Sequence, residues 1–373
     1  MGAERRLGVA AAVVDGALVE GDVAVAAGAV VGVGLPGRGS GTAIAGLVDL
    51  QVNGFAGVDL LGAQDDEAWR HVARRLLRVG VTAWQPTLIT APSQVALDAL
   101  GRASRLRRGE GGSAKVLGVH LEGPFLAPGR LGAHPAEHRR DPDPALLQAM
   151  LGAGPVLMVT LAPERAGAMS LIDTLARRGV VVSLGHTDAT AAEATAAFAR
   201  GAMAVTHVFN AMGGIAAREP GVAGAALADP RVTVQCIADG VHVADDTLRV
   251  VLAAAAGRVA LVSDSIAAAG AGGGGGDHRL GEVAVHVRGG RATRADGTLA
   301  GGVGTVLDGI RRLAGLGVPL AEAVAAGTTV PARLLGRRDV GSLRVGVPAD
   351  VVVLADDLSI RRVLLAGGEV VSA

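Results

Sequence analysis

The 373-residue sequence has no tyrosine, only four phenylalanines and two tryptophans, and a single cysteine. One cysteine cannot form a disulfide within the chain, and Cys236 lies in the apolar run VTVQCIADG, where a thiol usually fills core space. Lys and Arg balance Asp and Glu at 35 each, so charge does not favour nucleic acid or an anionic membrane as a partner. The longest uncharged run, 144–163, is interrupted by GAGP and is not a membrane span. These absences favour a globular protein of the reducing cytoplasm.

The middle of the chain alternates short β-branched apolar runs with amphipathic segments rich in Ala, Leu and Arg. Such alternation is typical of parallel strands joined by crossover helices. Eight such units favour a closed (β/α)8 barrel over an open sheet. The predicted strands cover 44–51, 81–87, 116–122, 156–161, 180–185, 203–208, 232–238 and 259–263.

The two ends of the chain show a different pattern. Residues 5–43 hold short apolar runs between Gly/Asp turns, and the C-terminal run PADVVVLADDLSIRRVLLAGGEVV is similar. We therefore predict an α/β protein with two parts. A TIM-type (β/α)8 barrel covers 46–344, and a small β-sandwich domain is formed by both chain ends, 1–45 and 345–373. The glycine run 270–276 is expected to be a flexible loop.

Polar side chains gather where the predicted strands end. In a barrel these ends share one face, which is the face that carries active sites. The strand-end residues are Gln51 and Asn53 after the first strand, Glu122 after the third, His186 after the fifth, His207 after the sixth, His242 after the seventh and Asp264 after the eighth.

Glu122, His186 and His207 offer a carboxylate and two imidazoles, a ligand set that suits Zn²⁺ and also Fe, Mn or Co. Each histidine alone would be read as a core residue, but their convergence on one barrel mouth favours metal binding. A metal lowers the pKa of bound water from about 15.7 to about 7. Asp264, which otherwise resembles a helix cap, is then placed to take the water proton and return it to a leaving amine. His242 is placed to polarise the scissile carbonyl.

Two observations favour one metal ion per subunit instead of two. The only lysine, Lys115, precedes the third strand, so it is expected at the opposite end of the barrel and cannot bridge two metals. The first strand ends in Gln51-Val-Asn53 and not in His-x-His. Gln51 and Asn53, together with His120 two residues before Glu122, are expected to surround the ligands without binding the metal.

The strings that contain these residues resemble the N-acetylglucosamine-6-phosphate deacetylases of the amidohydrolase superfamily. The matching strings are GLVDLQVNG, PTLIT, GVHLEGPFL, GAHPAEH, LAPE, SLGHTDAT, THVFNAM, REPG, IADGVHV, LVSDSIAAAG and GSLRVGVPADVVVL. They run in order through 46–270 and 340–355. In combination they indicate this family, whereas the metal ligands alone would indicate only the superfamily.

The resemblance implies hydrolysis of the acetamide of N-acetyl-D-glucosamine 6-phosphate to glucosamine 6-phosphate and acetate. It assigns a metal-bound water as the nucleophile, Asp264 as the general base and acid, and His242 as the carbonyl-polarising group. His134 is implied to contact the sugar, and Asn210 and Ala211 the phosphate. Arg218 is implied to reach the phosphate in the neighbouring subunit, which predicts a homodimer, and a guanidinium suits phosphate because it donates two parallel hydrogen bonds.

The sequence departs from the family pattern at 300–305, which reads AGGVGT where GS-x-L-T is expected. Two further functions therefore stay open. The substrate can be N-acetylgalactosamine 6-phosphate, or the protein can be another amidohydrolase of C–N bonds. A non-catalytic sugar-phosphate sensor is the third alternative, although such a protein usually lacks a metal ligand or the general base, and neither is missing here.

Overall fold

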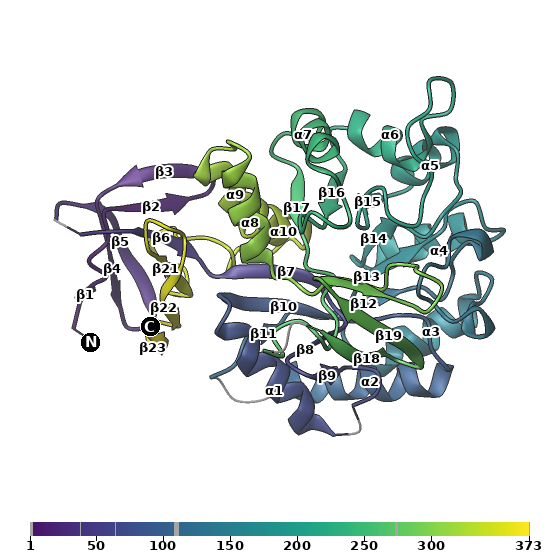
Figure 1. Cartoon of the computed structure of the whole chain (residues 1–373), viewed down its shortest axis with the longest axis horizontal. Coiled ribbons are helices and arrows are strands. Elements are labelled where there is room, and N and C mark those ends of the chain that lie inside the picture. The colour runs from purple at the N-terminus through teal and green to yellow at the C-terminus, as the bar shows by residue number, and fades with distance from the viewer. Residues whose placement is uncertain (1–2, 38, 64, 108–111, 273–274, 373) are drawn as a thin grey trace.

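The computed structural model describes residues 3–37, 39–63, 65–107, 112–272 and 275–372. Parallel strands form a nearly closed barrel at its centre (Figure 1). Their order is β7 (Leu47–Val52), β10 (Val81–Leu88), β11 with β12 (Lys115–Val116 and Val119–Glu122), β13 (Val156–Leu161), β14 (Val181–Leu184), β15 (Ala202–Val205), β16 (Thr233–Cys236) and β17 (Val259–Leu261). β11 and β12 both pair with β10 and are two pieces of one strand, so the predicted barrel of eight strands is confirmed.

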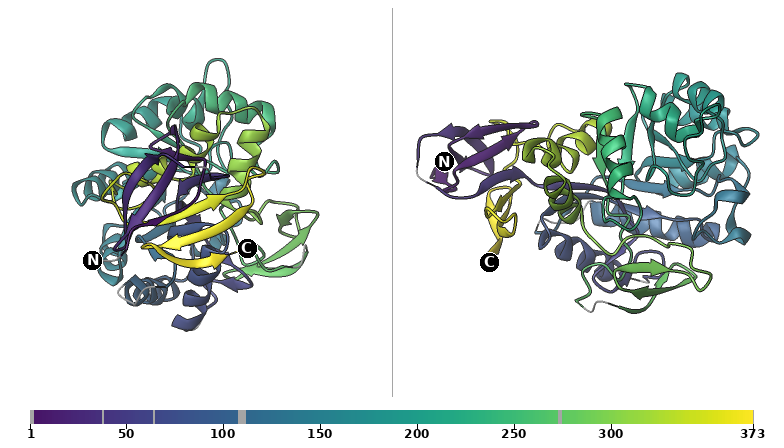
Figure 2. Two further views of the ribbon diagram at one scale, coloured as in Figure 1. Left: turned by 90° about the vertical axis from the view of Figure 1, so that its left-hand side faces the viewer. Right: turned by 45° about the horizontal axis from the view of Figure 1, so that its top comes forward.

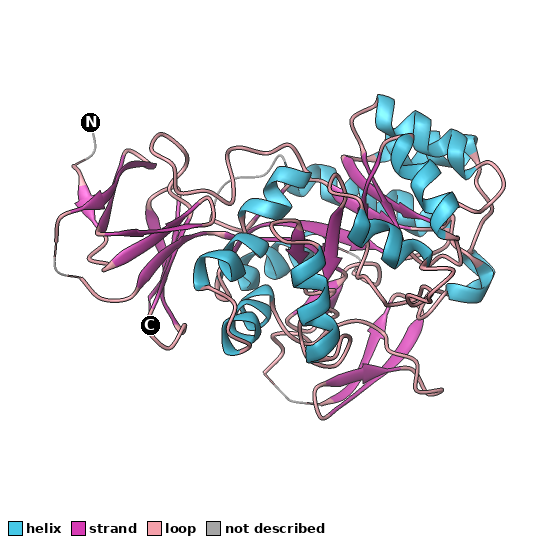
Figure 3. Cartoon of the chain, turned by 90° about the horizontal axis from the view of Figure 1, so that it is seen from above, coloured by secondary structure: helices cyan, strands magenta, loops and turns pink. Residues whose placement is uncertain are grey.

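Helices surround the barrel, as the view from above shows (Figure 3). Several begin at a side chain that accepts a backbone N–H of the first turn, such as Asp65, Asp143, Thr190 and Thr305. The helices are α1 (Asp66–Leu77), α2 (Ser93–Arg107), α3 (Pro144–Ala153), α4 (Ala168–Arg177), α5 (Ala191–Ala199), α6 (Gly221–Ala228), α7 (Asp245–Ala254), α8 (Val306–Gly315), α9 (Leu320–Ala326) and α10 (Thr329–Leu334). Among the described residues, no helix is both long and apolar enough to cross a membrane.

Both chain ends supply strands to a separate pair of sheets (Figure 2). The larger sheet holds β2 (Ala11–Val14), β3 (Ala17–Glu20), β6 (Thr42–Ala45), β21 (Val351–Leu354), β22 (Ile360–Leu365) and β23 (Gly368–Ser372), and the smaller holds β1 (Arg5–Arg6), β4 (Asp22–Ala26) and β5 (Ala29–Leu35). Val25 and Val30 of the smaller sheet share a buried cluster with Ala43 and Val353 of the larger. The predicted sandwich of both ends is confirmed, while the domain boundaries at 45/46 and 344/345 stay a prediction.

The first predicted strand, 44–51, is wrong at its start. Residues Thr42–Ala45 belong to β6 of the end sheet, and the barrel strand begins only at Leu47. The chain passes between the two at Gly46, where an added Cβ would lie 2.0 Å from the Thr82 hydroxyl oxygen. This close approach explains why glycine stands at the junction.

A small sheet follows the glycine run, with strands β18 (Gly276–Leu280), β19 (Val283–Arg288) and β20 (Arg291–Thr293). Gly273 and Gly274 of the run lie outside the described residues. Cys236 is buried in β16, and desolvation raises the pKa of its thiol to about 12, which fits the predicted core role. The cytoplasmic location stays a prediction.

The seam between the first and last barrel strands is held by a backbone bridge between Val52 and Ser265 and by side chains. Within the described strands β7 and β17 share no ladder, and the Asp49 carboxylate instead accepts the backbone N–H of Gln51 and of Ser263, both at 3.2 Å. The Ser263 hydroxyl donates back to the Gln51 carbonyl at 3.2 Å. Asp49 is 1% exposed, and burial raises the pKa of its carboxyl to about 6.

We predict that Asp49→Asn makes the protein more stable above about pH 7 and removes a pH dependence. The folded-state pKa of about 6 exceeds the unfolded value near 3.9, so the unfolded state releases the proton first. The wild-type free energy of unfolding therefore falls between about pH 4 and 6, on the order of 2 kcal/mol, and then levels off. Asn keeps an acceptor oxygen without the buried charge. Urea unfolding at several pH values measures this, and an identical slope in the variant would contradict it.

Candidate metal centre and active site

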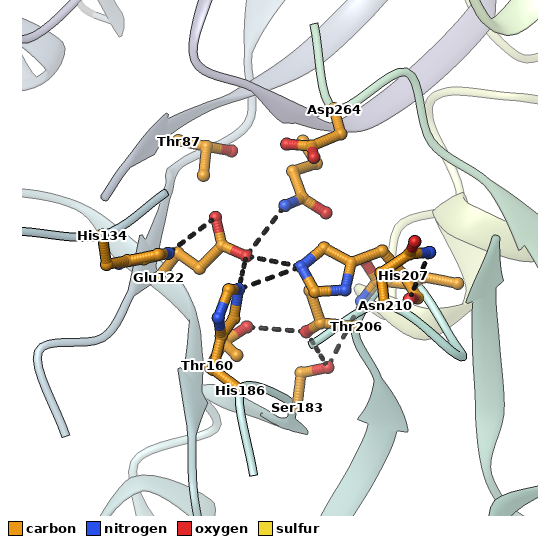
Figure 4. A network of polar contacts seen from close by, with 12 residues as sticks. Thr87, Glu122, His134, Thr160, Ser183, His186, Thr206, His207, Asn210 and Asp264 are labelled. Carbon is orange, nitrogen blue, oxygen red and sulfur yellow. Dashed lines mark hydrogen bonds and ion pairs between the residues drawn. The ribbon is translucent and has the colours of Figure 1, made fainter. Parts of the chain in front are cut away.

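Three side chains converge at the carboxyl end of the barrel (Figure 4). Glu122 ends β12, while His186 and His207 follow β14 and β15. Glu122 Oε1 lies 3.1 Å from His186 Nε2 and 2.9 Å from His207 Nε2, and the two Nε2 atoms are 3.1 Å apart. The three residues are 3–5% exposed. The structure thus brings the three predicted ligands together.

The arrangement fits a single divalent ion. His186 Nδ1 lies 2.8 Å from the Arg130 carbonyl oxygen, which can only accept, so Nδ1 carries the hydrogen and Nε2 presents its lone pair to the centre. Two imidazole nitrogens and one carboxylate oxygen facing one point at these separations allow an ion about 2.0–2.2 Å from each. Of the two groups of metal-ligating side chains among the described residues, only this one is buried.

The chain bends sharply where these strands end. His186, His207 and Asp264 have positive φ angles of 50°, 29° and 47°. Non-glycine residues in the left-handed region cost about 1–3 kcal/mol each and occur mainly at functional sites. Backbone preference alone would favour glycine at these three positions, so the side chains of His186, His207 and Asp264 are kept for another reason.

The charges in the centre influence one another. Burial alone would raise the pKa of Glu122, but the adjacent His186 and His207 rings lower it well below its usual range. Burial alone would lower the pKa of His207, but the neighbouring Glu122 carboxylate outweighs this effect and raises the pKa of the ring. The Asp264 carboxyl, which accepts Asn53 Nδ2 at 2.8 Å, has its pKa raised to about 7, mainly by desolvation and then by the negative charge of Glu122. A carboxyl that titrates near neutrality suits both proton uptake and proton release.

A layer of polar groups lies next to the ligands. Gln51 Nε2 donates to Glu122 Oε1 at 3.1 Å. His120 is fully buried, 2.7 Å from the Thr160 hydroxyl and 3.2 Å from the Leu50 carbonyl, and burial lowers its pKa to about 4. Its ring nitrogens are therefore engaged away from Glu122, His186 and His207.

A cavity of about 350 Å³ opens above the centre. Nearly every predicted site residue contributes to its lining, namely Asn53, Glu122, His134, His186, His207, Asn210, Ala211, His242 and Asp264. Phe209 also lines the cavity, together with an apolar wall of Ile89, Leu280 and Leu299 that the sequence did not predict. Leu280 and Leu299 come from the segment that matches the family least well, so no motif pointed to them.

Asp239 has two functions in the structure. Its Oδ1 accepts the backbone N–H groups of Val241 and His242, which shapes the turn after β16. Its Oδ2 lies 2.8 Å from His242 Nδ1 and orients the ring beside the cavity. The sequence alone does not distinguish a turn residue from an orienting carboxylate, because both uses need the same side chain.

Arg218 does not line this cavity. It lies exposed in the loop between β15 and α6, and among the described residues its side chain has no hydrogen bond or ion pair. His138, from the same loop as His134, also lies outside the cavity, with Nε2 2.9 Å from Glu282 Oε2. Lys115 is ion-paired with Asp339 at 3.3 Å, away from the three-residue cluster.

The departure at 300–305 has a steric explanation. Gly302 donates its backbone N–H to the Asp264 carbonyl at 2.8 Å, and an added Cβ would lie 2.2 Å from the Ser263 carbonyl oxygen. Serine, which the family pattern places in this segment, does not fit at Gly302 with this backbone. The absence of a serine hydroxyl at position 302 therefore follows from the close approach of the Ser263 carbonyl.

The sequence model of the amidohydrolase family matches residues 42–370. An N-acetylgalactosamine-6-phosphate deacetylase of Escherichia coli O157:H7 is 38% identical over 325 residues, 86% of this chain and 85% of that protein. The human N-acetylglucosamine-6-phosphate deacetylase is 38% identical over 336 residues, 86% of this chain and 81% of that protein. The solved structure of a mutant N-acetyl-D-glucosamine-6-phosphate deacetylase from Mycobacterium smegmatis, in complex with N-acetyl-D-glucosamine 6-phosphate, superposes with a TM-score of 0.92 at 37% identity and covers 100% of both chains.

We predict that Glu122→Ala abolishes metal binding, because it removes the carboxylate that both histidines face. Asp264→Asn should retain one ion per chain, since Asp264 lies outside the three-residue cluster. Elemental analysis of the purified variants gives the metal content. Full occupancy in the Glu122 variant would contradict the ligand assignment.

Proposed function

This chain belongs to the amidohydrolase family, and we propose that it hydrolyses the acetamide of N-acetyl-D-glucosamine 6-phosphate. The products are glucosamine 6-phosphate and acetate. The observation that carries the proposal is the convergence of Glu122, His186 and His207 beside Asp264 in one cavity.

The three-residue cluster holds one divalent ion in this proposal, with Zn²⁺ as the first candidate and Fe, Mn or Co as alternatives. When bound, such an ion acts as a Lewis acid and lowers the pKa of a coordinated water from about 15.7 to about 7. Gln51 supports the site by donating to the Glu122 oxygen that both histidines face. Asn53 orients the Asp264 carboxylate in the same way.

Asp264 carries the proton in both halves of the reaction. It takes a proton from the attacking water, whose oxygen bonds to the acetyl carbon, and returns that proton to the sugar nitrogen as the C–N bond breaks. Burial favours the protonated form of this carboxyl and so helps it to return the proton to nitrogen. His242, fixed by Asp239, polarises the carbonyl from the side of the cavity.

Substrate contacts come from the upper wall of the cavity. Asn210 and Ala211 line it after β15 and suit the phosphate, while His134 suits a sugar oxygen. Arg218 donates to the phosphate of the substrate that is bound in the neighbouring subunit. The protein is therefore a homodimer in this proposal. The exposed position of Arg218 outside its own cavity supports this assignment.

Two configurations of the sugar are compatible with the relatives of this chain. Relatives named for the gluco and for the galacto substrate are equally similar, at 38% identity. N-acetylgalactosamine 6-phosphate is therefore the second candidate substrate. The sensor alternative is disfavoured, because the ligand set and Asp264 are both present in the structure.

We expect the zinc-loaded protein to release acetate from N-acetyl-D-glucosamine 6-phosphate. The unphosphorylated sugar should react far more slowly, and the galacto epimer decides between the two candidate substrates. Asp264→Asn should lower kcat about 10²–10⁴-fold with metal retained, because proton transfer is lost. If metal-loaded protein releases no acetate from any of the three sugars, the proposal fails.

Subunit mixing tests the role of Arg218. Homodimers of Arg218→Ala and of Asp264→Asn should each be nearly inactive. Co-expression produces mixed dimers in which one of the two sites has both groups intact if Arg218 acts across the interface. About one quarter of the wild-type activity should return when subunits pair at random. No recovery in purified mixed dimers would show that Arg218 does not act on the partner's site.

A further inference from the structure

Two neighbouring imidazoles face the same carboxylate in different ways. The rings of His134 and His186 are 4.4 Å apart between centroids at an interplanar angle of 63°. His186 Nε2 lies 3.1 Å from Glu122 Oε1, and His134 Nε2 lies 3.8 Å from Glu122 Oε2 (Figure 4). Only 0.7 Å separates these two distances, so proximity alone does not explain why one ring binds a metal and the other does not.

The partners of the outer ring nitrogens differ in kind. His186 Nδ1 faces the Arg130 carbonyl oxygen, an acceptor, so this ring carries its hydrogen on Nδ1. His134 Nδ1 instead receives the backbone N–H of Thr90 at 3.2 Å, with the Thr90 hydroxyl 2.9 Å away. A backbone amide can only donate, so Nδ1 of His134 bears a lone pair and the hydrogen sits on Nε2.

We infer that Thr90 fixes His134 as the Nε2–H tautomer and so makes it a hydrogen-bond donor into the cavity in place of a fourth metal ligand. The inference deepens the proposed function and rests on it for the identity of the substrate. A ring in this tautomer has no lone pair to offer a metal at Nε2. The coordination position on its side therefore stays open to water and substrate.

The packing around Thr90 holds it against His134. Thr90 and His134 are both 3% exposed, so bulk water does not compete for Nδ1. Gly123, with φ +91°, lies against Thr90, and a Cβ there would be 2.5 Å from the Thr90 hydroxyl oxygen. The segments 86–90 (PTLIT) and 120–124 (HLEGP) therefore contact each other here. Because residue 123 is glycine, there is space for the Thr90 hydroxyl.

The tautomer also defines the chemistry that His134 recognises. An Nε2–H group contacts acceptors, which here are Glu122 Oε2 and an oxygen of the substrate. A substrate hydroxyl or carbonyl oxygen satisfies it, whereas an ammonium group at the same place does not. Thr90 is accordingly a positioning residue that selects for an oxygen through His134.

Nitrogen NMR of the zinc-loaded protein, labelled with 15N at histidine, tests the tautomer without any substrate. We expect His134 to show an unprotonated Nδ1 and a protonated Nε2, and His186 to show the reverse at Nδ1. His134→Gln identifies the His134 signals by their loss. A protonated Nδ1 in His134 would overturn the inference, and this result is independent of whether the proposed substrate is correct.

Activity in a double-mutant cycle tests the positioning role. Thr90→Val keeps the side-chain shape and the backbone N–H that fixes the tautomer, and removes only the hydroxyl 2.9 Å from His134 Nδ1. Loss of this second contact loosens the ring and should lower kcat/KM about two- to tenfold, whereas Thr90→Ser should restore most of it. In the His134→Gln background, Thr90→Val should cause no further loss. An equal loss in both backgrounds would show that Thr90 acts by another route.

Discussion

The site depends on one oxygen atom, Oε1 of Glu122. Nε2 of His186, Nε2 of His207 and Nε2 of Gln51 all lie within 3.1 Å of it, and they come from three other strands of the barrel. Parallel strands closed into a barrel present their carboxyl ends to one face, which makes this meeting possible. Residues that lie up to 85 positions from Glu122 in the sequence thereby share one centre.

The partner of the outer ring nitrogen distinguishes three histidines around this centre, His186, His134 and His242, in the proposed function. A carbonyl oxygen on Nδ1 prepares His186 to bind a metal, and a backbone amide on Nδ1 prepares His134 to donate. The Asp239 carboxylate orients His242. The imidazole group is the same in all three, so differences in function come from neighbours that do not touch a reacting atom.

The protein accepts local costs to build this face. His186, His207 and Asp264 adopt left-handed backbone conformations, and Asp49, a carboxyl buried almost completely, bonds across the seam of the barrel. Burial raises the pKa of the Asp264 carboxyl, whereas a solvated carboxyl would be fully ionised at neutral pH and only a weak base. The surrounding strands and helices keep these unfavourable groups in place because each packs into a continuous buried core.

The sequence by itself determined the order of strands, the two β-rich ends and the three candidate metal ligands, because hydrophobic period and strand-end polarity are local properties. Only the tertiary structure decided which side chains meet. The contacts of Thr90 with His134, the two uses of Asp239 and the apolar wall of Leu280 and Leu299 depend on loops whose approach no local pattern encodes. The same holds for Gly302, where a departure from the family pattern became a steric requirement once Ser263 was placed beside it. Strand periodicity is set by neighbours in the chain, whereas hydrogen-bond partners are set by neighbours in space.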